Sequence, residues 1–212
     1  MNASLEKLIS LASAPLSEDT PRLIGQVHEL TGAIGTQLLE LLWARNGFYA
    51  FESALHVLPA TNSPKVIGLA RWNSAESWRS DYGEMAHGCL FFGEDLVGGQ
   101  FCVFNDAAYK FDPETGEKTL LGETIGQWAD VILRDHRGQT LWPLGHEWQA
   151  KHGNLPPGKR LAPKTPFVLG GEYSIDNLYV ADAEELMRFY ANVAVQLHDL
   201  PEGARVTLRT VD

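Results

Sequence analysis

The stretch Gly153–Lys159 has the residue types of a phosphate-binding loop. Its sequence, GNLPPGK, matches the spacing in which backbone amides and a lysine hold phosphate. Arg160, however, stands where such loops carry the Ser or Thr that binds magnesium, and the two prolines remove amide donors. No strand is expected before it, so the pattern does not predict a nucleotide site.

Two histidines give a second chemical pattern. His146-Glu147 is followed by His152, which is similar to the zinc-protease motif His-Glu-x-x-His. That motif needs histidines at i and i+4 so that both face one metal ion, whereas here the second lies at i+6 and points away on a helix. The other histidines are scattered, without a Cys/His cluster at ligand spacing. We therefore expect no metal and no cofactor.

Acidic side chains are concentrated in the middle of the chain. Eight carboxylates and a single base, Lys110, lie between Asp81 and Glu117. Those at turns could form an acid/base pair, but turn acids usually cap backbone amides, and no nucleophile is expected beside them. If the turns share a sheet edge, the acids form a surface that attracts a basic partner; the alternative is a solvated face. The carboxylates expected to bind a partner are Asp81, Glu84, Glu94, Asp95 and Asp106.

Aromatic residues are the complementary candidates. Tryptophan is enriched among the residues that anchor protein interfaces. We expect Trp72 and Trp142 to contribute to a partner surface, and burial in the core is the alternative. No residue is expected to be catalytic.

These candidates depend on an antiparallel meander expected over Gly88–Gly116. Three apolar strands, Cys89–Phe92, Gln100–Phe104 and Ala108–Phe111, alternate with turn signals. Both glycines of the Gly98-Gly99 hairpin are expected to reach positive φ, and Asn105-Asp106 tolerates the same conformation. The residues with an expected structural role in turns are Gly93, Gly98, Gly99, Asp112, Pro113 and Gly116.

Helices are expected around this sheet. Apolar spacing and N-capping patterns predict them near residues 4–12, 20–30, 38–43, 74–82, 124–135, 142–148 and 182–197. Residues 151–166 contain four prolines and should form a crossing loop, while further strands are expected at 167–169, 177–180 and 205–210. The prediction is an α+β fold with a strongly bent antiparallel central sheet of about five to six strands.

Composition limits the class of protein. The 212 residues are 44% hydrophobic, enough for one packed core, and we expect a single domain over 1–212 with 138–212 as its C-terminal extension. A net charge of −10 argues against nucleic-acid binding. We expect no secretory signal and no membrane segment, and we expect Cys89 and Cys102 to be inert core residues of a cytoplasmic protein.

Several stretches resemble a known group. FFGEDLVGGQFCVFND, YKFDPETGE and the helix beginning IGQWADVIL are similar to the SUKH superfamily of Smi/Knr type, most clearly over Leu38 to Leu133. That group includes bacterial immunity proteins, the SecY-binding protein Syd and fungal cell-wall regulators. The resemblance implies a mixed α+β binding domain that neutralises a partner toxin by stoichiometric binding, and the acidic side chains favour a basic toxin domain as that partner. A regulatory scaffold for an endogenous envelope or signalling partner is the alternative, and an uncharacterised hydrolase is the third.

Overall fold

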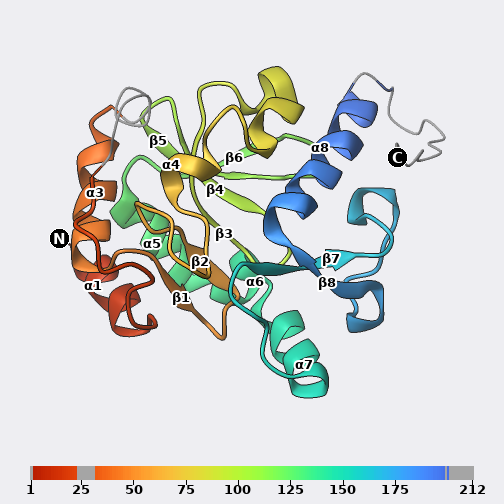
Figure 1. Ribbon diagram of the computed structural model, residues 1–212, viewed down its shortest axis with the longest axis horizontal. Helices are drawn as coiled ribbons and strands as arrows, with labels where there is room; N and C mark the ends of the chain where they lie inside the picture. The colour runs from red at the N-terminus through yellow and green to blue at the C-terminus, as the bar shows by residue number, and fades with distance from the viewer. Residues whose placement is uncertain (1, 23–31, 199, 201–212) are drawn as a thin grey trace.

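The centre of the molecule is a six-stranded antiparallel sheet. A computed structural model describes residues 2–22, 32–198 and 200 (Figure 1). The strands pair in chain order, and a separate antiparallel hairpin follows later in the chain. This arrangement confirms the α+β prediction. The sheet strands are β1 (Phe48–Ala50), β2 (Leu55–Val57), β3 (Leu90–Glu94), β4 (Gln100–Phe104), β5 (Ala107–Phe111) and β6 (Lys118–Gly122), and the hairpin strands are β7 (Lys159–Pro163) and β8 (Leu178–Asp182).

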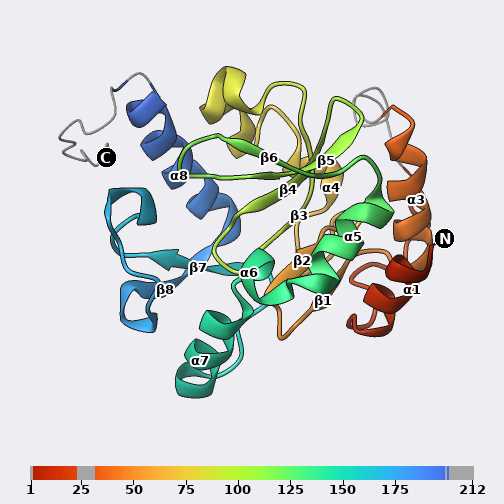
Figure 2. The ribbon, with the colours of Figure 1, turned by 180° about the vertical axis from the view of Figure 1, so that it is seen from behind.

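Helices cover one face of the sheet, and Trp128 lies at the contact between them. Trp128 of α5 (Ile125–Arg134) packs edge-on against Phe92 and Phe101. Two more helices, α1 (Ala3–Ser10) and α3 (Ile34–Ala44), pack beside α5 (Figure 2).

The opposite face carries an aromatic cluster, because successive side chains of a strand point to opposite sides. Trp78 and Tyr82 of the 3₁₀ helix η1 (Trp78–Ala86) contact Phe91 and Phe111. The short α4 (Leu69–Trp72) contacts β3, and α8 (Ala183–His198) lies along η1 on this side (Figure 1).

The C-terminal third adds a hairpin and a covering helix, and none of its described strands joins the central sheet. Leu186, Met187 and Tyr190 of α8 belong to the main core. A second apolar cluster joins Leu96 to Leu161. The remaining elements are α6 (His136–Thr140), α7 (Trp142–His152), η2 (Phe167–Leu169) and η3 (Ile175–Asn177). Within the described ranges, no helix is long and apolar enough to cross a membrane.

The predicted meander and most of its turns are confirmed. Gly98 has φ of +90°, and Asn105 and Asp106 have φ of +47° and +56°. Asp112 and Pro113 open the last turn, and Gly116 donates to the Asp112 carbonyl over 2.8 Å. Gly99 does not have positive φ, so that part of the prediction is wrong.

Gly93 has a different role from the predicted one. It lies inside β3 at an irregularity in the register with β4, and a Cβ there would come within 2.8 Å of the His56 carbonyl oxygen. The glycine therefore permits a close approach of two strands, not a turn.

Three local predictions are wrong. Residues 74–77 form a turn, and η1 starts only at Trp78. Residues 151–166 contain the end of α7 and all of β7. The strand tolerates Pro163 because one edge of a two-stranded hairpin is unpaired, and a residue facing that edge needs no amide hydrogen to donate. Residues 167–169 form η2 instead of a strand. The helix predicted over 20–30 lies mostly outside the described residues, and the strand over 205–210 lies wholly outside them.

Candidate functional site

The predicted acidic surface is not one surface. Asp81, Glu84 and Asp106 are exposed, but Asp81 pairs with Arg188 at 2.9 Å and Asp106 accepts from the Ile34 amide at 2.9 Å. Glu94 and Asp95 are only 1% and 2% exposed. Their assignment to a partner surface is wrong, because both are covered where β3 ends and each has a cationic neighbour inside the protein.

The two predicted aromatic anchors differ. Trp72 is 1% exposed and its indole Nε1 donates to Gln100 Oε1 over 3.0 Å, so it is a core residue and not an anchor. Trp142 stays half-buried beside the Arg137 guanidinium.

The two histidines of the zinc-protease-like pattern have different neighbours: His146 pairs with Glu52, while His152 stacks on Trp148. In the part of the chain that the structure describes, no three His, Cys, Asp or Glu side chains could jointly hold a metal ion.

An open cleft of about 470 Å³ lies between the meander and the C-terminal hairpin. We call it the acidic cleft; Asp95, Lys110, Asp112, Glu114, Phe167 and Tyr173 are among its lining residues. Phe167 and Tyr173 stack with ring centroids 4.0 Å apart, and Tyr173 is still 64% exposed. The cleft therefore presents a preformed aromatic pair beside several carboxylates.

The charges of the acidic cleft are unbalanced. Among the described residues that line it, the one lysine is Lys110, which is already paired with Asp95 at 3.0 Å. Burial raises the pKa of Glu114, although that carboxylate accepts from the backbone amides of Phe167 and Val168. Burial likewise raises the pKa of Asp112. A cation that enters the cleft would favour the ionised form of these carboxylates and so offset part of the cost of their burial.

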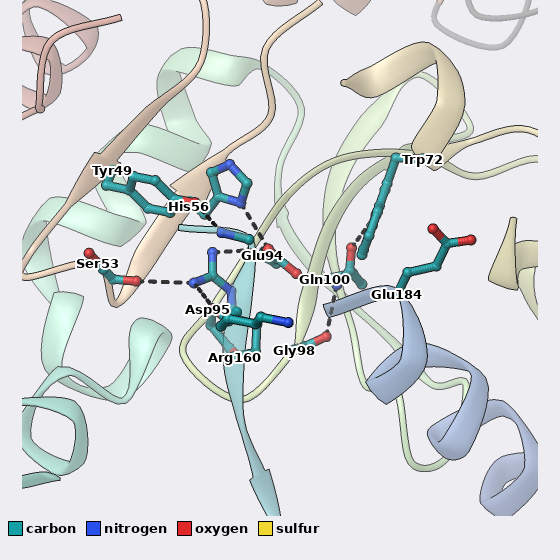
Figure 3. Close-up of polar contacts among 12 residues, drawn as sticks. Tyr49, Ser53, His56, Trp72, Glu94, Asp95, Gly98, Gln100, Arg160 and Glu184 are labelled. Atoms are coloured by element: carbon teal, nitrogen blue, oxygen red, sulfur yellow. Dashed lines mark hydrogen bonds and ion pairs between the residues drawn. The ribbon is translucent and has the colours of Figure 1, made fainter. Parts of the chain in front are cut away.

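A second polar group is buried where β2, β3 and β4 meet β7 (Figure 3). Antiparallel pairing places His56 opposite Glu94 and Glu94 opposite Gln100, so their side chains lie in one row on one face. Arg160 enters from β7. We call these four residues the His56–Glu94 cluster.

Glu94 is the hub of the His56–Glu94 cluster. Its Oε1 lies 2.8 Å from His56 Nδ1 and 2.9 Å from Arg160 Nη2. Gln100 Nε2 approaches Oε2 at 3.4 Å and donates more closely, at 2.9 Å, to the Gly98 carbonyl. Arg160 Nη1 donates to the Lys159 carbonyl over 3.0 Å. The guanidinium and the histidine thus contact the same oxygen of the carboxylate.

The protonation states follow from burial and these contacts. Burial lowers the pKa of His56 below its ordinary value of 6.5. Burial alone would raise the pKa of Glu94, but Arg160 and His56 together lower it. At neutral pH the histidine is therefore neutral and donates its Nδ1 proton to an ionised Glu94, which leaves Nε2 as an acceptor.

His56 Nε2 has no hydrogen-bond partner within the described protein although it is buried. In Figure 3 this atom lies on the far side of the ring from Glu94. His56, Glu94 and Trp72 line a cavity of about 340 Å³ whose other walls come from the 62–67 loop and the start of α8. The carboxylate–histidine pair therefore lies in the wall of an open pocket.

Sequence reasoning alone does not find this cluster. In the sequence His56 is one of several scattered histidines, and Arg160 stands out only as a misfit in a phosphate loop. The available signal is alternation: Tyr49, His56, Glu94 and Gln100 occupy positions that face one side of consecutive strands, and three of them are polar in otherwise apolar strands.

Acid should destabilise the protein through this cluster. Because the pKa of His56 is lowered by folding, the unfolded chain binds an extra proton below pH 6.5, so the free energy of unfolding falls as the pH drops from there; the lowered pKa of Glu94 acts in the same direction below its ordinary value of 4.5. Urea titrations across this range should show a shallower pH dependence for His56→Gln than for wild type. His146→Gln, at a histidine whose side chain is 57% exposed, is the control and should follow wild type. Equal slopes for all three proteins would contradict the assignment of a neutral His56.

Comparison with known proteins bears on the fold alone. No protein-family model and no curated protein matches the chain. The structure is similar to the crystal structure of Atu4351 from Agrobacterium tumefaciens, with a TM-score of 0.59 and 13% sequence identity over 88% of this chain and 87% of that one. The two chains therefore share an α+β architecture over most of their length.

Proposed function

We propose that this protein is a non-catalytic, cytoplasmic binding protein that neutralises a basic partner by one-to-one association, as SUKH-type immunity proteins do. The observation that supports this is the acidic cleft, where a stacked aromatic pair with one exposed ring, Tyr173, stands beside desolvated carboxylates. The resemblance of the meander sequence to that group supports the toxin class of partner. The two free, buried cysteines agree with a reducing compartment.

The cleft has the features of an interface hot spot. Aromatic side chains that are already stacked lose little freedom on binding, and they surround charged pairs with apolar surface that excludes water. Carboxylates that folding has partly desolvated have lost water before the partner arrives, so an arginine or lysine that enters restores an interaction they lack. Tyr173 is the expected anchor, and Asp112 is the expected partner of a cation.

Affinity capture tests this function with matched variants. Wild type, Tyr173→Ser and Asp112→Asn are immobilised and exposed to lysate of the source organism, and bound proteins are quantified by mass spectrometry. The controls are Tyr179→Ser, at an exposed tyrosine on β8 outside the cleft, and Glu117→Gln, at an exposed carboxylate outside it. We expect one basic protein to bind wild type and both controls, and to be depleted about tenfold on Tyr173→Ser.

Purified components then test the mechanism. Calorimetry should give one-to-one stoichiometry, and Asp112→Asn should slow association and flatten its salt dependence, because electrostatic attraction acts mainly on the association rate. An envelope or signalling partner would favour the regulatory scaffold. A partner that binds all variants equally would contradict the assignment of the acidic cleft as the binding site.

A further inference from the structure

We infer that the acidic cleft selects arginine over lysine, because the planar guanidinium of an arginine from the partner stacks on the exposed ring of Tyr173 and pairs with the carboxylate of Asp112. The inference rests on the proposed function, which requires only that the partner is basic, and it adds which basic side chain enters the cleft. Tyr173 and Asp112 both line the cleft and are both exposed, so an incoming side chain can reach them.

The cleft has an excess of acidic groups that its own cation does not balance. Among the described residues that line it, three are carboxylic acids, Asp95, Asp112 and Glu114, and one is a lysine, Lys110. The Lys110 ammonium is held by Asp95 at 3.0 Å and by the Gln139 carbonyl at 2.8 Å. A cation is therefore the kind of ligand that the cleft attracts.

The other two carboxylates act on that cation in different ways. Glu114 is 4% exposed and its two oxygens accept from the amides of Phe167 and Val168 at 3.0 and 2.6 Å, so it attracts a cation without contacting it. Asp112 is exposed, and its carboxylate is oriented by the Glu114 amide, which donates to Oδ1 over 2.8 Å. Asp112 is thus the carboxylate that an arriving cation contacts.

The ring of Tyr173 distinguishes one cation from another. Phe167 covers one face of it, with the ring centroids 4.0 Å apart and the planes 4° from parallel, yet Tyr173 is still 64% exposed. Such exposure with one face covered means that the other face is open. Burial, and then the charges of Glu114 and Asp112, raise the pKa of Tyr173, which shows that these carboxylates are close to the ring. An open aromatic face near carboxylates favours a cation that can stack.

Arginine suits this site better than lysine because of its shape and hydration. A guanidinium is planar and weakly hydrated, so it can lie flat on the ring while its N–H groups donate to a carboxylate. An ammonium is a compact, strongly hydrated point charge, which loses more water in the cleft and gains less from the ring. The volume of about 470 Å³ leaves room for a whole side chain with its hydrocarbon stem.

Three capped amino acids test this selectivity directly. Nα-acetyl-arginine N-methylamide carries a planar charged group, the lysine derivative carries the charge without the plane, and the citrulline derivative has the plane without the charge. Each is titrated into the ¹⁵N-labelled full chain at neutral pH and constant ionic strength, and the amide resonances of Glu114, Phe167 and Val168 are followed by NMR. We expect the arginine derivative to bind about fivefold more tightly than the lysine derivative and about tenfold more tightly than the citrulline derivative.

Variants separate the contribution of the ring from that of the charge. Tyr173→Leu keeps an apolar side chain but removes the aromatic face, so the preference for arginine over lysine should disappear. Asp112→Asn should weaken the binding of both cations about tenfold and leave citrulline unchanged. Tyr179→Leu, at an exposed tyrosine on β8 outside the cleft, is the control and should follow wild type.

The outcomes distinguish this inference from the proposed function. Equal binding of the arginine and lysine derivatives to wild type, or tighter binding of lysine, would overturn the inference and leave a basic partner in place. A preference for arginine that persists in Tyr173→Leu would overturn it too, as would the lack of a saturable shift with any derivative. The proposed function fails separately, in affinity capture, if the captured protein is not basic or binds the cleft variants as well as wild type.

Discussion

Replacing Arg160 by Met should lower the free energy of unfolding by about 3–5 kcal/mol, the usual cost of leaving one charge of a buried pair alone. Arg160 is 1% exposed and lies 2.9 Å from Glu94, which is itself 1% exposed. The methionine fills similar space but removes the positive charge that keeps Glu94 ionised. Urea denaturation followed by tryptophan fluorescence measures the loss.

Two comparisons separate charge from packing in this prediction. Lys159→Met, at the neighbouring residue, breaks an ion pair with Asp182 whose two side chains are 41% and 39% exposed, and it should cost less than about 1 kcal/mol. The double variant Glu94→Leu with Arg160→Met removes both buried charges and should recover most of the loss. The Cζ atom of Arg160 lies 5.6 Å from the centroid of the Tyr49 ring. If the double variant is as unstable as Arg160→Met, then the guanidinium stabilises the protein through its packing on Tyr49 and not through Glu94.

Local signals explain the parts of the fold that the sequence predicted. Thr124 caps the helix that follows it, with the Gln127 amide donating to Thr124 Oγ1 over 3.0 Å, as the capping pattern indicates. Asn105 and Asp106 form the turn between β4 and β5 with positive φ, which few other residues adopt without strain. Each of these features depends on residues within a few positions of one another.

The His56–Glu94 cluster depends on contacts between distant parts of the chain, which local sequence patterns do not predict. Glu94 precedes Asp95 and a glycine pair, so it has the appearance of a turn acid on the surface. It is buried because β7 brings Arg160 across the end of the sheet from 66 positions later in the sequence. The basic, proline-rich composition of 151–166 gave no reason to expect that its arginine would be wholly enclosed. Long-range pairing of this kind is set by the packing of the whole chain.

The loop after β3 gives the second large expected effect: Gly99→Ala should destabilise the protein by about 3 kcal/mol, which corresponds to a decrease of roughly 6–12 °C in Tm for a chain of this size. A Cβ at Gly99 would lie 2.3 Å from Asp95 Oδ2. That carboxylate cannot move freely, because its Oδ1 accepts from the amides of Val97 and Gly99 and its Oδ2 pairs with Lys110. Calorimetry of wild type and variant measures the change.

The reason for a glycine at this position is therefore a close approach and not positive φ. Gly170→Ala is the matched control for φ alone: Gly170 has φ of +87° in the left-handed region, and the methyl group of an alanine there would meet nothing within 4 Å, so the substitution should cost only about 1–2 kcal/mol. The decisive comparison repeats Gly99→Ala in an Asp95→Ala background, where the obstructing carboxylate is gone. We expect the added cost there to fall below about 1 kcal/mol, because the two substitutions act on one contact. A cost that stays at its wild-type value would mean that the glycine is required by the backbone of the loop, independently of Asp95.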